Sequence, residues 1–297
     1  MKKLKIGKES WIFLIAICVS FCFIRGNYLY KKNLEEARIK AKIERSKEEA
    51  KKAEEAKVED IPKDISDTEV IKYLKEFQKR TKSDKRYNEV IKNSKEYHPD
   101  VLKLLYNNKE TLDFVISKSS LKMPSIFVKI DEKCGNGVIP MLQQWDPKWG
   151  WYNYGENIIA LNGCGPTSLV MVITGLTGND GINPMEIAKY SDDNGYHEKA
   201  GTNWDLMTDV TEQYGVKGSR IDITKESFEN ELNNGKPIIC SVSKGYFTDE
   251  GHFIVIAGIK DGKLIIHDPN SIEKSKKLWE FDKIKDQIKA AWSYSLE

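Results

Sequence analysis

Leu161-Asn162-Gly163-Cys164-Gly165-Pro166-Thr167-Ser168-Leu169-Val170-Met171-Val172 is the stretch that decides the fold of this chain. Glycines on both sides of Cys164 let the backbone turn sharply and approach a substrate closely. Pro166 suits a first helical turn, and the apolar run that follows indicates a buried helix ending near Gly175. Cys164 therefore stands at a helix N-terminus, where the helix dipole favours the thiolate, and we predict that it is a nucleophile.

A thiolate nucleophile needs a general base, and His252 is the best placed of the four histidines. It begins Gly251-His252-Phe253-Ile254-Val255-Ile256-Ala257-Gly258, which is typical of a buried strand. A second apolar run, 264–266, leads to His267-Asp268, and Asp261-Gly262 lies between the two runs. This pattern predicts a β-hairpin with His252 near one end and Asp268 near the other.

The register of the hairpin decides whether Asp268 can orient His252. A two-residue turn at Asp261-Gly262 places Asp268 opposite Val255, on the face away from His252. A three-residue loop over 260–262, with Gly262 in the left-handed region, moves Asp268 to the same face as His252. We therefore expect that loop, or an equivalent one-residue bulge.

In that register Asp268 should accept a hydrogen bond from Nδ1 of His252, which leaves Nε2 facing Cys164. Asn270 would lie directly across from His252 and is the alternative third member. His267 turns to the other face, where we expect a structural histidine. His197 is expected in a loop beside the cleft.

The remaining candidate residues are weaker when taken singly. Gln143 and Gln144 precede the cysteine, and a glutamine amide can donate a hydrogen bond to an oxyanion. Cys240 lies in Pro237-Ile238-Ile239-Cys240-Ser241-Val242, which is typical of a core cysteine. His98 precedes Pro99, where we expect a surface residue or a helix cap.

Taken together, Q-W-D-P-K-W-G, G-C-G-P-T-S, G-H-F-I-V-I and H-D-P-N-S resemble the motifs of the C-39-like cysteine peptidases, which are papain-fold relatives of bacteriocin-leader-processing peptidases. The resemblance covers roughly 138–292. It implies an α+β papain-like domain in which a helix carrying the cysteine packs on an antiparallel sheet. It also implies the catalytic set Cys164, His252 and Asp268, with Gln144 as the oxyanion donor. The substrate would be a peptide or protein, and no cofactor or metal is expected.

Two other functions remain open on the sequence. A cell-wall amidase or endopeptidase that cuts peptidoglycan peptides could use the same fold and the same residues. A non-catalytic binding module is the third reading, although the intact set of four residues argues against it.

Charge and cysteine content exclude other classes. The chain has 47 basic and 45 acidic residues, but positions from 141 onward carry 16 basic and 23 acidic ones, a net of −7. That half is a poor candidate for nucleic-acid binding. Five cysteines are too few for a disulfide scaffold, and no Cys/His cluster has zinc-ligand spacing.

The N-terminal part reads as a membrane-attached stalk. Residues 1–10 are a basic, cytoplasmic tail, and Trp11 to Ile24 form an apolar run. No small-x-small cleavage site follows, so a signal anchor over 11–30 is favoured over a cleaved signal peptide. The peptidase would then lie outside the cytoplasm. A charged helical stalk over 31–62, ended by Pro62, is favoured over a coiled coil.

Two further parts complete the predicted organisation. A helical segment spans 63–123 and begins with a capping box, Ser66-Asp67-Thr68-Glu69. The papain-like domain spans 124–297. The sequence leaves open whether the helical segment inhibits, positions or merely spaces that domain.

Overall fold

The computed structural model describes residues 8–120, 128–198 and 201–297. The chain divides into two compact units, 1–58 and 59–297. The second unit combines helices with a six-stranded antiparallel sheet, so the predicted α+β class is confirmed. It holds the helical segment as well as the sheet; the predicted boundary between 123 and 124 lies outside the described residues.

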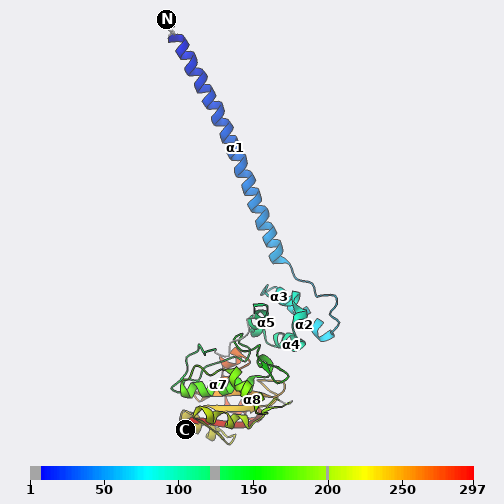
Figure 1. Ribbon diagram of the computed structural model, residues 1–297, viewed down its shortest axis with the longest axis vertical. Coiled ribbons are helices and arrows are strands. Elements are labelled where there is room, and N and C mark those ends of the chain that lie inside the picture. The colour runs from blue at the N-terminus through cyan, green and yellow to red at the C-terminus, as the bar shows by residue number, and fades with distance from the viewer. Residues whose placement is uncertain (1–7, 121–127, 199–200) are drawn as a thin grey trace. The chain divides into compact units, whose positions relative to one another are not determined.

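The first unit consists of helix α1, Lys8–Ala56, which runs without interruption through the predicted anchor and stalk (Figure 1). The helix ends at Ala56, six residues before the predicted end at Pro62. Among the described residues, no helix has an apolar stretch long enough to span a membrane. The side chains of 8–18, which include the start of the predicted apolar run, lie outside the described residues.

Four short α-helices and three 3₁₀ turns form the described part of the helical segment, up to residue 120. They are α2 (Thr68–Arg80), α3 (Tyr87–Lys92), η1 (Ser94–Glu96), α4 (Pro99–Asn107), η2 (Lys109–Thr111), α5 (Leu112–Ser117) and η3 (Lys118–Ser120). The cap of α2 is Asp67, whose carboxylate accepts from the backbone of Glu69 and Val70 at 2.8 and 3.1 Å. The prediction of Ser66 was wrong by one residue; a carboxylate beside the positive end of the dipole is the stronger acceptor.

The sheet has the strand order β5-β10-β6-β7-β8-β9, with all neighbours antiparallel. Its strands are β5 (Val216–Arg220), β6 (Ile238–Val242), β7 (His252–Lys260), β8 (Lys263–His267), β9 (Leu278–Trp279) and β10 (Ile288–Leu296). Two short hairpins lie outside it: β1 (Asn153–Tyr154) with β2 (Asn157–Ile158), and β3 (His197–Glu198) with β4 (Gly201–Thr202).

Helix α7, Cys164–Thr177, packs on this sheet, as Figure 1 shows. The other helices of this part are α6 (Ile159–Asn162), α8 (Pro184–Asp193), α9 (Leu206–Asp209), η4 (Thr211–Tyr214), α10 (Lys225–Asn233), α11 (Ile272–Ser275), α12 (Phe281–Ile284) and η5 (Lys285–Gln287). Helix α7 passes Gly175 and ends at Thr177, and its C-cap is Gly178, whose φ is 75°. A Cβ at Gly175 would lie 2.4 Å from Cδ1 of Ile139, so this glycine allows close packing and does not stop the helix.

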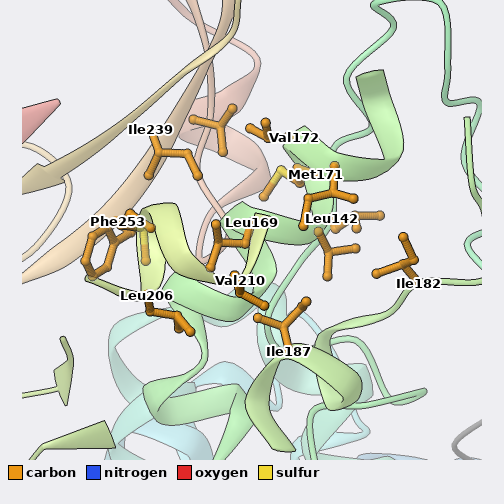
Figure 2. Close-up of a cluster of buried hydrophobic side chains, with 14 of the residues drawn as sticks. Leu142, Leu169, Met171, Val172, Ile182, Ile187, Leu206, Val210, Ile239 and Phe253 are labelled. Carbon is orange, nitrogen blue, oxygen red and sulfur yellow. The ribbon is translucent and has the colours of Figure 1, made fainter. Parts of the chain in front are cut away.

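The two faces of the sheet bury separate clusters. Figure 2 shows Leu169 and Val172 of α7 among Ile239 of β6 and Phe253 of β7. Because side chains alternate along a strand, the neighbouring residues turn to the opposite face, where α10 and α12 cover them. Cys240 is fully buried in that second cluster, which confirms it as a core residue.

The β7–β8 hairpin closes with the two-residue turn Asp261-Gly262, since Lys260 pairs with Lys263. The expected three-residue loop was wrong. Asp261 and Gly262 have φ of 51° and 71°, the positive values that a tight hairpin turn needs. However, the register shifts between Ile256 and Gly258, so Ala257 forms a one-residue bulge, the alternative that the sequence allowed.

Candidate active site

Cys164 is the first residue of α7 and is half-buried. Glycine is required on both sides of it, because neighbouring atoms leave no room for a side chain there. A Cβ at Gly163 would lie 2.5 Å from Cγ2 of Ile159, and one at Gly165 would lie 2.8 Å from Oγ1 of Thr202. The G-C-G pattern thus lets the start of α7 fit between α6 and strand β4.

His252 connects Asp268 with Cys164. Nε2 of His252 lies 2.7 Å from Oδ1 of Asp268. The imidazole is also close enough to the Cys164 thiol to lower its pKa. Because Nε2 is taken by the carboxylate, Nδ1 is left for the sulfur. The predicted assignment of the two ring nitrogens was therefore reversed. The bulge at Ala257 makes this contact possible, since beyond it the strands pair in the register that places Asp268 opposite Ile254.

Electrostatics favour an ion pair between the cysteine and the histidine. Burial by itself would lower the pKa of His252, but the Asp268 carboxylate and Cys164 outweigh it and raise that pKa to about 10. Burial would raise the pKa of the Cys164 thiol, but the imidazole and the backbone N–H groups of Phe253 and Gly165 lower it. A thiolate beside an imidazolium is the reactive form of a cysteine nucleophile.

Asp268 is held by the loop that follows β8. Its side chain is fully buried, and Oδ1 also accepts from the backbone N–H of Asn270 at 2.8 Å. The backbone N–H of Asp268 donates to Oγ of Ser275 at 2.9 Å. Nζ of Lys274 lies 3.9 Å from Oδ2 and donates to the carbonyl of Phe247 at 2.8 Å. These contacts fix the carboxylate in one orientation.

Gln144 is buried beside the segment that leads into α7. Its Nε2 donates to the carbonyl of Ala160 at 2.9 Å and lies 3.4 Å from that of Leu161. Its backbone N–H donates to the carbonyl of Pro269 at 2.8 Å, which ties it to the Asp268 loop. Gln143 contributes its carbonyl to Nε1 of Trp149 at 2.8 Å.

The other predicted histidines lie outside the Cys164–His252–Asp268 set. Nδ1 of His267 lies 3.2 Å from the carbonyl of Pro140, as expected of a structural histidine, and burial lowers its pKa. His98 caps α4: its Nδ1 accepts from the backbone N–H of Asp100 at 3.3 Å. His197 lies edge-on to the ring of Tyr154, with ring centroids 4.7 Å apart.

Asn270 does not take the third position. Its carbonyl oxygen accepts from Nδ2 of Asn108 at 2.6 Å and from Nε1 of Trp145 at 3.2 Å. It contributes to the site through its backbone N–H, which donates a hydrogen bond to the Asp268 carboxylate. Sequence reasoning missed Asn108 and Glu110, which contact this loop from the helical segment. No local pattern marks such contacts between residues about 160 positions apart.

Within the part of the chain that the structure describes, no group of three His, Cys, Asp or Glu residues could hold a metal ion. The free cysteines include Cys22, Cys134, Cys164 and Cys240. Burial raises the pKa of the Cys134 and Cys240 thiols, whereas at Cys164 the imidazole and backbone N–H groups outweigh burial and lower it.

The comparison with protein families identifies the class. A family model described as the Peptidase C39 like family matches residues 138–295, more than half of the chain. The chain therefore belongs to the C39-like peptidase family. The match contains the four predicted residues Gln144, Cys164, His252 and Asp268.

Solved structures and curated proteins add little to this assignment. The peptidase domain of Streptococcus ComA, a bifunctional ABC transporter involved in quorum sensing, is 21% identical with a TM-score of 0.36, and the match covers 46% of this chain and 93% of that one. A C39-like peptidase from Bacillus anthracis is 15% identical with a TM-score of 0.38, over 56% and 99% of the two chains. At these values the assignment rests on the family model alone. No curated protein matches the chain.

Proposed function

We propose that this protein is a cysteine peptidase that hydrolyses peptide bonds through Cys164, His252 and Asp268. The observation that carries the proposal is the buried imidazole between a carboxylate, 2.7 Å away, and the thiol at the start of α7. Family membership supports the same reaction class. A structural histidine would not need a fully buried carboxylate on one side and a thiol with a lowered pKa on the other.

In the proposed mechanism the Cys164 thiolate attacks the carbonyl carbon of the scissile peptide bond. The imidazolium of His252 gives its Nδ1 proton to the leaving amine, which departs and leaves an acyl group on the sulfur. Neutral His252 then takes a proton from water, the resulting hydroxide attacks the thioester, and the acid product leaves with the thiolate restored. Asp268 holds the ring by accepting from Nε2 throughout.

The oxyanion of each tetrahedral intermediate needs hydrogen-bond donors. We assign these to the backbone N–H of Cys164 and to one N–H of the Gln144 amide. In the structure the amide donates to the carbonyls of Ala160 at 2.9 Å and Leu161 at 3.4 Å. The proposal therefore requires the N–H on the longer bond to turn from Leu161 to the oxyanion, while the bond to Ala160 holds the amide. Replacing Gln144 by alanine therefore tests this role, and a larger effect from replacing Gln143 would transfer it to that residue.

The test is hydrolysis by the purified full-length protein in detergent, offered peptide pools and purified sacculi separately. We expect cleavage of peptides and a covalent adduct of a peptidyl chloromethyl ketone at Cys164, both abolished in Cys164→Ala. Cys240→Ala is the matched control, since that thiol is buried on the other side of the sheet. Release from sacculi without peptide cleavage would indicate a peptidoglycan hydrolase. Inactivity on both would refute hydrolysis.

We also propose that the N-terminal helix anchors the protein in the membrane with the peptidase domain outside the cytoplasm. Support comes from the apolar run 11–24 after a basic tail and from the exposure of Phe21, Phe23 and Ile24, which are 68–73% accessible on α1. Membrane fractionation and protease accessibility of intact cells test the two halves of this proposal. Recovery of the full-length chain in the soluble fraction would refute the anchor.

A further inference from the structure

The position of Asp268 depends on a loop and not on a strand. Strand β8 ends at His267, so Asp268 is the first residue of the segment 268–275, which ends with the four-residue helix α11. Inside this segment the Asn270 N–H donates to Asp268, and the Asp268 N–H donates to Ser275. Whatever holds 268–275 therefore also sets the angle at which the carboxylate meets His252.

Glu110 of the helical segment holds this loop by three hydrogen bonds. Its Oε2 accepts from Oγ of Ser271 and from the backbone N–H of Ile272, each at 3.0 Å. Its Oε1 accepts from the backbone N–H of Glu273, also at 3.0 Å. Both carboxylate oxygens are thus used, and hydrogen bonds to an ionised acceptor are stronger than neutral ones.

Asn108 provides a second attachment two residues away. Its Nδ2 donates to the carbonyl of Asn270 at 2.6 Å, while its Oδ1 accepts from the backbone N–H of Glu110 at 3.0 Å. The amide therefore links Glu110 to the peptide unit between Asn270 and Ser271, two residues after Asp268. Lys109 adds an exposed ion pair with Glu273, 3.4 Å apart, which contributes little by itself.

The helical segment packs against the peptidase part through a buried cluster, so the backbone that carries Asn108 and Glu110 is held in place. Trp145 and Ala160 share one buried cluster with the helices α2 to α5, and Ile272 packs against it. The ring of Phe114 stacks on that of Trp151 with centroids 4.3 Å apart. The cluster spans both sides of the attachment, because Trp145 is the neighbour of Gln144 and Ile272 lies in the loop after Asp268.

We propose that Glu110 and Asn108 are positioning residues, which hold the segment 268–275 and thereby set Asp268 against His252. The proposal rests on the proposed function, since it assigns the helical segment a role in the same active site. The helical segment that carries Asn108 and Glu110 then belongs to the catalytic unit and is neither an inhibitor nor a spacer. Its effect on catalysis passes entirely through the loop.

The experiment uses the full-length protein and compares Glu110→Gln, Glu110→Ala and Asn108→Ala with the wild type. Glu69→Gln is the matched control, because Glu69 is an exposed glutamate of the same segment that pairs with Lys72 on its own helix. Kinetics with a peptide substrate across pH give kcat, KM and the pH limits of kcat/KM, and thermal unfolding gives stability.

We expect Glu110→Ala to lower kcat on the order of 10- to 100-fold with KM nearly unchanged, since small misplacements of a catalytic group have effects of this size. Glu110→Gln should lose less, because its single oxygen can still accept from the loop. The basic limit of kcat/KM, which reports His252 in the free enzyme, should move to lower pH in both variants. Glu69→Gln should match the wild type.

The outcomes separate the two proposals. If the wild type shows no Cys164-dependent hydrolysis, the proposed function fails. If the wild type is active and the Glu110 and Asn108 variants keep its kcat and its basic limit, the positioning role is wrong. A lower melting temperature with unchanged kinetics also refutes it, because Glu110 would then only stabilise the fold. Should Glu110→Ala not fold, Glu110→Gln decides, as it changes a single polar atom.

Discussion

Replacing Asp268 by asparagine should narrow the pH range over which the enzyme works. The change keeps the size of the side chain and an oxygen that can accept from Nε2 of His252, but it removes the negative charge. In the native protein burial opposes the imidazolium, yet the carboxylate and Cys164 raise the pKa of His252 from 6.5 to about 10. That difference corresponds to about 5 kcal/mol in favour of the imidazolium.

The expected size of the effect follows from this figure. Asp268 provides the larger favourable contribution and the imidazole stays buried without it, so its removal should forfeit at least half of the ~5 kcal/mol, or about 10²-fold or more in kcat/KM near neutral pH. The pKa of His252 should fall, which moves the basic limit down. The pKa of the Cys164 thiol should rise for lack of its cationic partner, which moves the acidic limit up. Asp268→Ala should lose more, since it also removes the acceptor.

Two measurements check this expectation. Hydrolysis across pH gives both limits of kcat/KM, and alkylation by iodoacetamide, followed by peptide mass spectrometry, gives the reactivity of each thiol. In the native protein Cys164 should be alkylated at pH values well below the ordinary pKa of a cysteine thiol. Cys134 should not, because burial and nearby acids raise the pKa of that thiol. Superimposable profiles for the native protein and Asp268→Asn would refute the assignment of Asp268.

Three further outcomes are expected. Gln144→Ala should lower kcat on the order of 10²- to 10³-fold, less than Cys164→Ala, as for the loss of one oxyanion donor; steady-state kinetics measure the difference. The fragment 59–297 should keep the kcat/KM of the full chain, because this unit holds all the site residues; a loss above tenfold would place a needed contact in the first 58 residues. Gly262→Val should destabilise the protein by about 1–2 kcal/mol in denaturant unfolding, because φ at this position is 71°.

The sequence predicts the start of α7 well because the signals there are local. A proline in the first turn and glycines beside Cys164 restrict the backbone within a few residues, and the structure places the helix start at Cys164 itself. The end of the helix is less well predicted. Gly175 looks like a stop in the sequence, but its lack of a side chain serves packing against Ile139, a contact between residues 36 positions apart.

The orientation of the imidazole is outside what one sequence can specify. Strand alternation tells which residues share a face, but not which ring nitrogen of His252 meets Asp268. That choice depends on the side-chain torsions at the start of β7, which the positions of Cys164 and Asp268 fix together. For a similar reason the attachment of Glu110 to Ser271 could not be anticipated, since it joins two segments that meet only through tertiary packing.

The hairpin shows how a wrong local prediction and a right global one can come from the same argument. The requirement that His252 and Asp268 share a face fixes the parity of the register, and parity changes by one wherever a single extra residue is inserted. The extra residue could lie in the turn or anywhere along β7 before His252 is reached. Asp261-Gly262 is among the best sequences for a two-residue turn, so the turn stays tight and the extra residue is Ala257. The geometry of the site is thus set by a bulge five residues from the imidazole, while the turn keeps its preferred conformation.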